Sequence, residues 1–392
     1  MTAAPAASCA LHDAGTCRSC PHLSLPMPTQ LAAKQSRVAA LLAEHVPSEL
    51  WQAPAASAPT GFRNKAKMAV AGTTSHPTLG ILDGAGCGVD LRTCPLHVPA
   101  IEAALPVLAD LVTELGLRPY DVPARHGELK YVLVTASPDD DLMVRFVLRS
   151  RRYLEQLRAA VPDLRRRLPQ LAVAAVNIQS VHQAVIEGPE EIVLTEEDRL
   201  LMRLSLPSPE RGGQAGLRAD GVELPLYLPT RSFFQTNTAV AEALYATARD
   251  WAEEAEPARV WDLFCGVGGF ALALPAIDGA RAAADLMGLD PALVRFEAGD
   301  ARVLDPAAGE RAGGVQHPDL LVVNPPRRGI GEQLATRIEA SGVERVLYSS
   351  CNPRTLAADL AHLPSMRVER SRLFDMFPHT EHAEVLVELV RD

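Results

Sequence analysis

The stretch that most limits the fold runs from residue 230 to the C-terminus, where short apolar runs alternate with helical segments. A helical segment at 238–255 leads into a strand-like run at 258–264, and further such runs follow at 293–300, 319–326, 344–351 and 382–390. Strands that alternate with helices form a parallel or mostly parallel sheet that is covered on both faces. We therefore predict a C-terminal α/β domain whose strands end at one common edge.

Three of these strands end in turns that could hold a ligand. They are WDLFCGVGGF, LLVVNPPRRG and YSSCNPRT. Ligands of such sheets bind in the crevice at the carboxyl ends of the strands, where glycine lets the backbone come close. No Lys followed by Ser or Thr stands after the glycines, which disfavours a nucleotide phosphate loop. On its own, the glycine turn does not distinguish a binding site from a structural turn.

Cys351 is the candidate nucleophile of this edge. A lone cysteine on an apolar strand is more often a buried structural thiol. Cys351, however, stands at a strand end between Ser350 and Asn352, where side chains face the crevice and a thiolate can react. Asn324 would present side-chain and backbone acceptors at the same edge.

The seven cysteines argue against a disulfide framework and for metal binding or catalysis. Cys9, Cys17 and Cys20 crowd the N-terminus, and Cys94 follows after a gap. Sets of four cysteines bind zinc or iron–sulfur clusters. The spacing of a zinc ribbon is incomplete because Cys94 has no partner two residues away, and Cys87 competes with it as the fourth ligand.

Charge and hydropathy point to a folded protein outside the membrane. The formal net charge of −10 lacks the basic character typical of nucleic-acid-binding domains, and local runs such as Arg165–Arg167 are more often solvated faces. The N-terminus has no basic start followed by an apolar run, so we expect no secretory signal. No stretch approaches the ~20 apolar residues that span a bilayer. We expect a cytoplasmic protein.

Composition divides the chain into three parts. Residues 1–30 form a Cys-rich arm. Residues 31–229 contain short β-like runs, interrupted by helical segments at 101–116 and 151–168, which indicates a central α+β domain. Residues 230–392 form the α/β domain described above.

Several motifs in a fixed order carry a resemblance to a known family. SFFQTN, WDLFCGVGGF, NPPRRG, SSCNPRT and FPHTEHAEVL follow one another, preceded by CALHDAGTCRSC, GFRNKAKM and the Cys94 region. Over nearly the whole chain this resembles the RNA uracil-C5 methyltransferase family. The start at the Cys cluster, without a preceding β-barrel RNA-binding module, is similar to the 23S rRNA uracil(747) branch.

The resemblance implies a Rossmann-like methyltransferase fold, S-adenosylmethionine as methyl donor and 23S ribosomal RNA as partner. The central domain would face the RNA, and no obligatory protein partner is evident. The target base should be flipped from its stack or drawn from a loop, because attack needs both ring faces accessible.

The resemblance also assigns the two residues that react. Carbon 5 of uracil is too poor a nucleophile to attack a sulfonium methyl directly. Addition of the Cys351 thiolate to carbon 6 would turn the ring into an enolate, and Glu384 would accept the carbon-5 proton afterwards. His379 and Glu381 are nearby alternatives for proton handling that match no assigned family role.

The remaining assignments concern cofactors. By the same resemblance, Gln235, Phe264 and Asn324 contact S-adenosylmethionine, and Cys265 beside Phe264 is a packed turn residue. The family's 4Fe–4S cluster would fall on Cys9, Cys17, Cys20 and Cys94. The match at Cys94 includes the Pro-Leu that follows it. We expect a structural or RNA-shaping role for the cluster, because methylation needs no electrons.

One segment departs from the family pattern. Where relatives have a helix, a strand ending in a ribose-binding Glu and a second helix, residues 271–287 read ALALPAIDGARAAADLM, so the strand and its Glu are absent. We expect the sheet to lack one strand and the run at 293–300 to move beside the first strand. Glu297 or Asp300 would then stand near the ribose.

Two other functions compete with this reading. An RNA-binding protein could have kept the scaffold and lost turnover with the missing strand, and assay of methyl transfer to unmodified rRNA would separate the two. In amino-methyltransferases a related NPP turn ends in an aromatic residue that stacks on the target. Arg327 stands at that position here, which disfavours an exocyclic amine as target.

Overall fold

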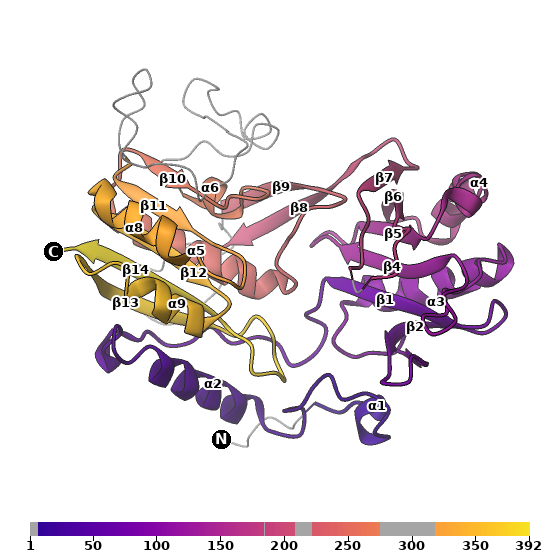
Figure 1. The fold of residues 1–392 in the computed structure, drawn as a ribbon, viewed down its shortest axis with the longest axis horizontal. Coiled ribbons are helices and arrows are strands. Elements are labelled where there is room, and N and C mark those ends of the chain that lie inside the picture. Colours follow the sequence, from indigo (N-terminus) through magenta and orange to yellow (C-terminus); the bar gives the residue numbers. More distant parts are fainter. Residues whose placement is uncertain (1–6, 184, 208–221, 275–317) are drawn as a thin grey trace.

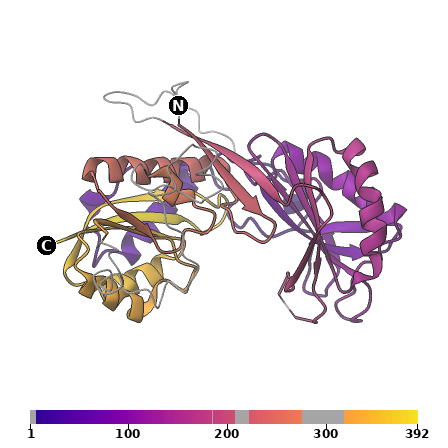
Figure 2. The ribbon, with the colours of Figure 1, turned by 90° about the horizontal axis from the view of Figure 1, so that it is seen from above.

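The computed structural model describes residues 7–183, 185–207, 222–274 and 318–392. They form two lobes, which lie side by side in Figures 1 and 2. We call the lobe that contains the C-terminus the C-terminal lobe, and the other the central lobe.

The C-terminal lobe is built on a five-stranded sheet of order β10-β11-β12-β14-β13. Its strands are β10 (Val260–Asp262), β11 (Leu320–Val323), β12 (Arg345–Ser350), β13 (Met366–Phe374) and β14 (Glu384–Arg391). β10, β11 and β12 run parallel, whereas β14 is antiparallel to both β12 and β13. The predicted α/β class is confirmed. The run at 293–300, with Glu297 and Asp300, lies outside the described residues, as does most of 271–287.

Helices cover both faces of this sheet, as the two views show (Figures 1 and 2). They are α5 (Thr238–Ala255), α6 (Gly269–Ala273), α8 (Gly331–Ser341) and α9 (Pro353–Leu360). Successive strand residues point to opposite faces. Leu320 and Val322 of β11 therefore join the core beneath α5, while Leu321 and Val323 join the core beneath α8 and α9.

Segments from earlier in the chain complete this lobe. They are α2 (Met27–Leu41), η1 (Ser48–Leu50), β8 (Arg199–Leu206) and β9 (Val222–Pro229). Val38 of α2 packs in the core with α8 and α9, and Leu204 of β8 packs in the core with α5. The division predicted at residues 30 and 229 differs from this packing, because each face of the sheet needs apolar cover that the following helices do not complete.

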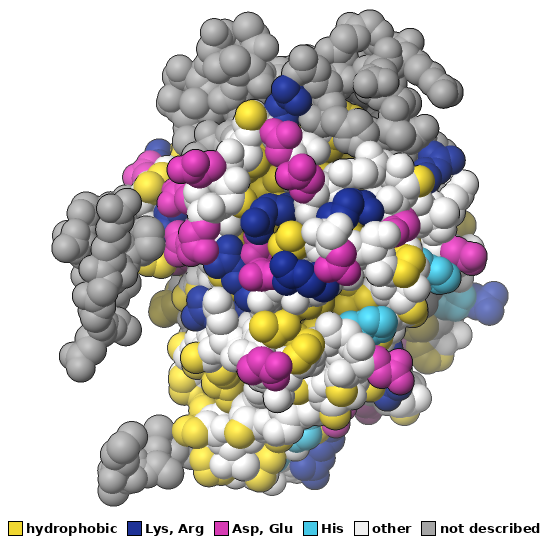
Figure 3. All heavy atoms as spheres, turned by 90° about the vertical axis from the view of Figure 1, so that its left-hand side faces the viewer, with side chains coloured by type: hydrophobic (Ala, Val, Ile, Leu, Met, Phe, Trp, Pro, Cys, Tyr) yellow, Lys and Arg dark blue, Asp and Glu magenta, His cyan; other side chains and the backbone are white. Residues whose placement is uncertain are grey.

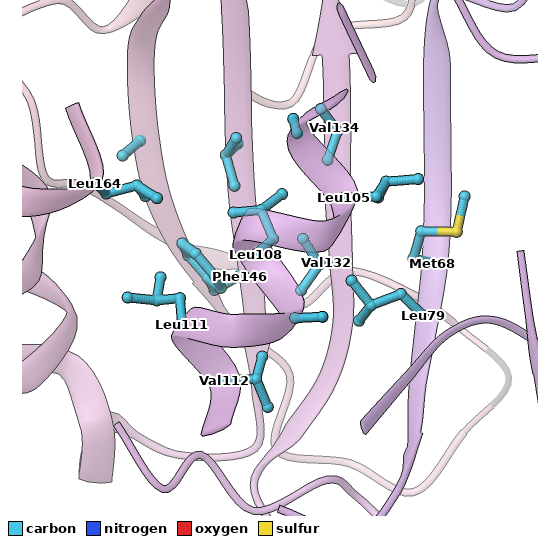
Figure 4. Packing of buried hydrophobic residues seen from close by; sticks show 14 of the residues in the cluster. Met68, Leu79, Leu105, Leu108, Leu111, Val112, Val132, Val134, Phe146 and Leu164 are labelled. Carbon is cyan, nitrogen blue, oxygen red and sulfur yellow. The ribbon is translucent and has the colours of Figure 1, made fainter. Parts of the chain in front are cut away.

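The central lobe is a seven-stranded sheet of order β3-β2-β1-β4-β5-β6-β7. Its elements are β1 (Lys65–Gly72), β2 (Pro77–Leu82), β3 (Gly88–Asp90), α3 (Pro99–Glu114), β4 (Leu129–Ala136), β5 (Leu142–Leu148), η2 (Arg151–Tyr153), α4 (Leu154–Arg167), β6 (Leu171–Ile178) and β7 (Glu190–Val193). Leu105 and Leu108 of α3 pack against Val132 and Phe146 of the sheet (Figure 4). Burying each such side chain contributes roughly 1.5–3 kcal/mol. The Cys-rich segment with α1 (Ala10–Asp13) also lies against this core, through Leu11.

Candidate active site

The carboxyl ends of the parallel strands bring the predicted site residues to one edge. β10 ends at Asp262 and β12 ends at Ser350. Because β14 runs in the opposite direction, it begins at this edge with Glu384. The C-terminus follows the far end of β14 and lies on the outer side of the lobe, so this edge faces the central lobe (Figure 1).

Cys351 follows directly after β12 and is half-buried. Ser350 pairs with Val385, so the thiol comes next to Glu384 at the start of β14. Burial raises the pKa of the Cys351 thiol, and the Glu384 carboxylate raises it further. The Arg327 guanidinium, hydrogen-bonded to the thiol, works in the opposite direction. A cation that favours the thiolate and a carboxylate that can take a proton therefore flank one sulfur.

Glu384 is a buried carboxyl group that accepts a hydrogen bond from a neighbouring strand. Ser349 Oγ donates a hydrogen bond of 2.5 Å to Glu384 Oε1. Burial raises the pKa of Glu384 to about 7, although the Ser349 hydrogen bond lowers it. A carboxyl group with a pKa near neutrality is well matched to proton transfer at the pH of a cell.

Hydrogen bonds join the turn after β11 to the turn after β12. Asn352 Nδ2 donates to the Arg327 carbonyl at 3.0 Å, and Thr355 Oγ1 donates to the same oxygen at 3.2 Å. Asn352 also caps α9, because its Oδ1 accepts from Arg354 N at 3.2 Å. In the sequence, Arg327 counts only as an argument against an amine target. Its contact with the thiol depends on the two turns meeting, which no local pattern reveals.

Phe264 and Asn324 lie after adjacent parallel strands and are both half-buried. Leu263 N donates to Val322 O at 3.0 Å, so the two strand ends leave the sheet side by side. The chain then turns at Gly268, whose φ of 89° lies in the left-handed region that glycine adopts without strain. Cys265 is half-buried in this turn, where its carbonyl accepts from Gly268 N at 2.7 Å.

Asp262 was not among the predicted site residues. Its Oδ1 accepts a hydrogen bond of 3.2 Å from Phe264 N, whereas Oδ2 is buried without a partner in the described part of the chain. Burial raises the pKa of Asp262 to about 7. Tyr245 of α5 lies close by, since burial and then the charges of Asp262 and Glu384 raise its pKa. The signal in the sequence is an acidic residue at the end of an apolar strand, the Asp of WDLF.

Gln235 stands before α5 and is buried. Asn64 Nδ2 donates to its carbonyl at 3.0 Å and to Thr238 Oγ1 at 2.8 Å. Its side-chain amide makes no hydrogen bond within the ranges that the structure describes. The contacts thus tie the backbone of Gln235 to the central lobe, and its role at the cofactor stays a prediction.

His379 and Glu381, the alternatives for proton handling, differ in their surroundings. His379 is fully buried, with Nδ1 at 3.2 Å from Gln30 Nε2 and Nε2 at 2.7 Å from the Pro59 carbonyl. Both ring nitrogens are therefore engaged in structural hydrogen bonds. Glu381 is exposed.

Three of the four predicted cluster ligands lie near enough to the fourth, Cys20, for their charges to act on its thiol. Burial, followed by the neighbouring thiols of Cys94, Cys17 and Cys9, raises the pKa of Cys20 to about 11. Cys87 is exposed in the turn between β2 and β3 and is not among these neighbours. Within the described residues, no group of three or more His, Cys, Asp or Glu side chains is arranged so that it could hold a metal ion. The cluster stays a prediction.

The outer end of the C-terminal lobe has a different character. Basic and acidic side chains are intermixed there (Figure 3). Where β12 and β13 begin and β14 ends, Arg345 and Arg370 both pair with Glu388, and Arg367 pairs with Glu369. Pairing of this kind weakens the attraction that the described arginines of this face could exert on phosphates.

Known proteins resemble the chain over its full length. The sequence model of the family described as "tRNA (Uracil-5-)-methyltransferase" matches residues 316–392. The 23S rRNA (uracil(747)-C(5))-methyltransferase of Escherichia coli O157:H7 (strain EC4115 / EHEC) is 44% identical, over 98% of this chain and 99% of its own. That of Halothiobacillus neapolitanus is 46% identical, with the same coverage. The structure of Pyrococcus abyssi tRNA (uracil-54, C5)-methyltransferase with S-adenosyl-L-homocysteine has a similar fold. Its TM-score is 0.72 at 23% identity, over 95% of this chain and 85% of that one.

Proposed function

Since the chain belongs to the RNA uracil-C5 methyltransferase family, we propose that it transfers a methyl group from S-adenosylmethionine to carbon 5 of a uridine in 23S rRNA. The observation that carries the proposal is the pair formed by Cys351 and Glu384 at the carboxyl edge of the sheet. A nucleophile beside a carboxylate is what addition to a pyrimidine ring followed by elimination requires. An enzyme that methylates an amine has no use for the pair.

In the proposed reaction, the Cys351 thiolate adds to carbon 6 of the uracil ring and leaves an enolate. The enolate makes carbon 5 nucleophilic, and carbon 5 would take the methyl group while the bond between that methyl and the sulfonium sulfur of the donor breaks and leaves a neutral thioether. Glu384 then removes the proton from carbon 5, the carbon–sulfur bond breaks, and the electron pair returns to Cys351. The raised pKa of Glu384, about 7, suits a base that must later release its proton to water.

Arg327 has a separate part in the first step. Its guanidinium contacts the Cys351 thiol and counteracts both burial and the Glu384 charge in setting the thiol pKa. We assign Arg327 to stabilising the Cys351 thiolate before the thiolate attacks the uracil ring, since a positive charge beside a thiol favours its charged form.

The cofactor supplies an electrophilic methyl group when it is bound. Residues at the ends of β10 and β11 fit such a ligand, because Asp262 Oδ2 is a buried acceptor that no described residue satisfies. An acceptor of this kind suits the ammonium group of an amino-acid moiety. Phe264 and Asn324 follow β10 and β11 at the same edge of the sheet. We propose that both of them, together with Gln235, contact S-adenosylmethionine.

We also propose that Cys9, Cys17, Cys20 and Cys94 hold a 4Fe–4S cluster. The effect of Cys9, Cys17 and Cys94 on the pKa of Cys20 supports this set, as does the exposure of Cys87. A cluster of four irons holds its thiolates further apart than a single ion does, so it needs a looser arrangement of the sulfurs. Held there, the cluster would tie the N-terminal arm to the central lobe.

Iron analysis of anaerobically purified protein tests this assignment. A protein with serine at any of the four positions should lose iron, whereas the Cys87→Ser variant should retain it. Zinc in place of iron, or iron lost only with the Cys87 variant, would contradict the assignment.

The substrate bears on location and partners. Ribosomal RNA is the partner that this function requires, and a cytoplasmic location goes with the proposal. No helix in the described ranges is long and apolar enough to cross a membrane.

Methylation of unmodified 23S rRNA tests the function directly. The purified chain should transfer a labelled methyl group from S-adenosylmethionine, and digestion to nucleosides should yield 5-methyluridine. RNA that binds without receiving a methyl group would instead support a binding protein with a degenerate domain. Label on an exocyclic amine would support the amino-methyltransferase reading.

A further inference from the structure

The loop that delivers Glu384 is held by residues far away in the sequence. Residues 375–383 connect β13 to β14 and end at Glu384, and we call them the delivery loop. Among them Asp375, Met376 and His379 are fully buried. A connection between antiparallel strands is normally exposed and mobile, so burial of this one needs a partner.

The partner is one face of α2. Its buried residues are Gln30, Lys34 and Val38, which stand four apart and therefore share a face. Val38 joins the apolar core, whereas the two polar residues turn toward the delivery loop.

Lys34 holds the start of the delivery loop. Its ammonium donates to Asp375 Oδ1 at 2.5 Å and to the Phe377 carbonyl at 2.8 Å. The side chains of both Lys34 and Asp375 are almost completely buried. A charge-assisted bond in such a setting is short and directional, which fixes the loop at this point.

Gln30 holds the middle of the delivery loop through His379. Its Oε1 accepts from His379 N at 2.9 Å, and its Nε2 lies 3.2 Å from His379 Nδ1. His379 has a φ of +62°, which is uncommon for a residue with a side chain. The backbone of His379 also accepts from His22 N at 3.1 Å. The surrounding hydrogen bonds thus maintain a backbone conformation that the chain would not keep alone.

We propose that Gln30, Lys34 and His379 are positioning residues for Glu384, so that α2 sets where the base stands relative to Cys351. The inference rests on the proposed role of Glu384 as base. Addition of the thiol and methyl transfer use Cys351 and the residues that follow β10 and β11, none of which belongs to the delivery loop. Loosening the loop should therefore impair the last step, removal of the carbon-5 proton, more than the steps before it.

The test uses 23S rRNA with tritium at carbon 5 of its uridines and a labelled methyl group on the donor. Methyl transfer reports the early steps, and tritium release reports proton removal. Gln30→Ala should slow tritium release by roughly tenfold to a hundredfold relative to methyl transfer, as expected for a misplaced group. A methyl-labelled covalent protein–RNA band should accumulate on denaturing gels.

The chain supplies a matched control in Gln179. Gln30 and Gln179 are both 2% exposed. The side-chain amide of each makes three hydrogen bonds, since Gln30 Nε2 also donates to the Leu25 carbonyl at 2.7 Å. Those of Gln179 join it to Val181, Val185 and Glu187 of the central lobe. Gln179→Ala should alter both readouts alike and accumulate no band. His379→Asn, which tolerates the same backbone conformation, should reproduce the effect if Gln30→Ala fails to fold.

Glu384→Gln distinguishes the proposed role of Glu384 as base from the proposed positioning role of Gln30 and His379. If Glu384→Gln accumulates the band and the Gln30 and His379 variants behave like Gln179→Ala, the positioning role is wrong and the base is retained. If Glu384→Gln accumulates no band, the base lies elsewhere and the inference fails with it.

Discussion

The burial of the Lys34–Asp375 ion pair predicts how much stability the protein should lose when the pair is broken. The side chain of Lys34 is 3% exposed and that of Asp375 is 1% exposed. Asp375 Oδ2 has no hydrogen-bond partner among the described residues, so Lys34→Met would leave the buried carboxylate without the ion pair that Lys34 provides. Breaking one side of a buried pair costs about 3–5 kcal/mol. For a lobe of this kind the melting temperature should fall by roughly 6–20 °C.

Removing both charges should behave differently. Burial lowers the pKa of Lys34 even though Asp375 raises it, so the cost of desolvation outweighs the attraction. Replacing both members of such a pair by apolar residues is often neutral or stabilising. The double variant Lys34→Met/Asp375→Leu should therefore recover most of the stability that Lys34→Met loses.

Thermal and urea unfolding of the full chain measure both effects. Arg158→Met serves as the control, because Arg158 pairs with Glu155 at 3.6 Å on an exposed helix surface. An exposed pair contributes about 0–1 kcal/mol, so this variant should melt close to the unaltered protein. The reasoning is refuted if Lys34→Met melts with the control, or if the double variant is no more stable than the single one.

Three further predictions concern the reaction. Cys351→Ala should abolish methylation and the covalent band while changing the melting temperature little, and a variant that retains more than a small residual activity would remove Cys351 from the mechanism. Because Glu384 acts as a carboxylate and its pKa is raised to about 7, single-turnover product release should rise with pH through neutrality and then level off. A flat profile would contradict this reading. Arg327→Gln should raise the pKa of Cys351 and shift the pH profile of adduct formation to higher pH. An unshifted profile would show that the guanidinium does not favour the thiolate.

Apolar periodicity predicted much of the fold. The strand-like runs at 319–326, 344–351 and 382–390 correspond to β11, β12 and β14. β13 escaped prediction because the polar run ERSR within its sequence MRVERSRLF interrupts the alternation of apolar and polar residues that indicates a strand. Arg370 pairs with Glu388 of the neighbouring strand and with Glu254. Such partners are known only once the strands are adjacent.

Strand-end reasoning likewise anticipated part of the site. A parallel sheet brings the ends of its strands together, so Phe264, Asn324 and Cys351 could be expected at one edge. The functional meaning of Gln30 and Lys34 could not be read, since polar residues on a helix normally indicate its solvated face. Only the delivery loop, more than three hundred residues later in the chain, turns that face inward.

The order in which the chain visits the two lobes determines where the protein can be truncated or a lobe exchanged. The N-terminal segment lies on the central lobe, α2 on the C-terminal lobe, β1 on the central lobe and β8 on the C-terminal lobe again. The chain therefore passes between the lobes three times before the methyltransferase motifs begin. A truncated protein starting at residue 230 would lack α2 and the β8–β9 hairpin, and its sheet would expose apolar faces that promote aggregation. An exchange of the central lobe with that of a relative would need junctions on both sides of it, between α2 and β1 and between β7 and β8.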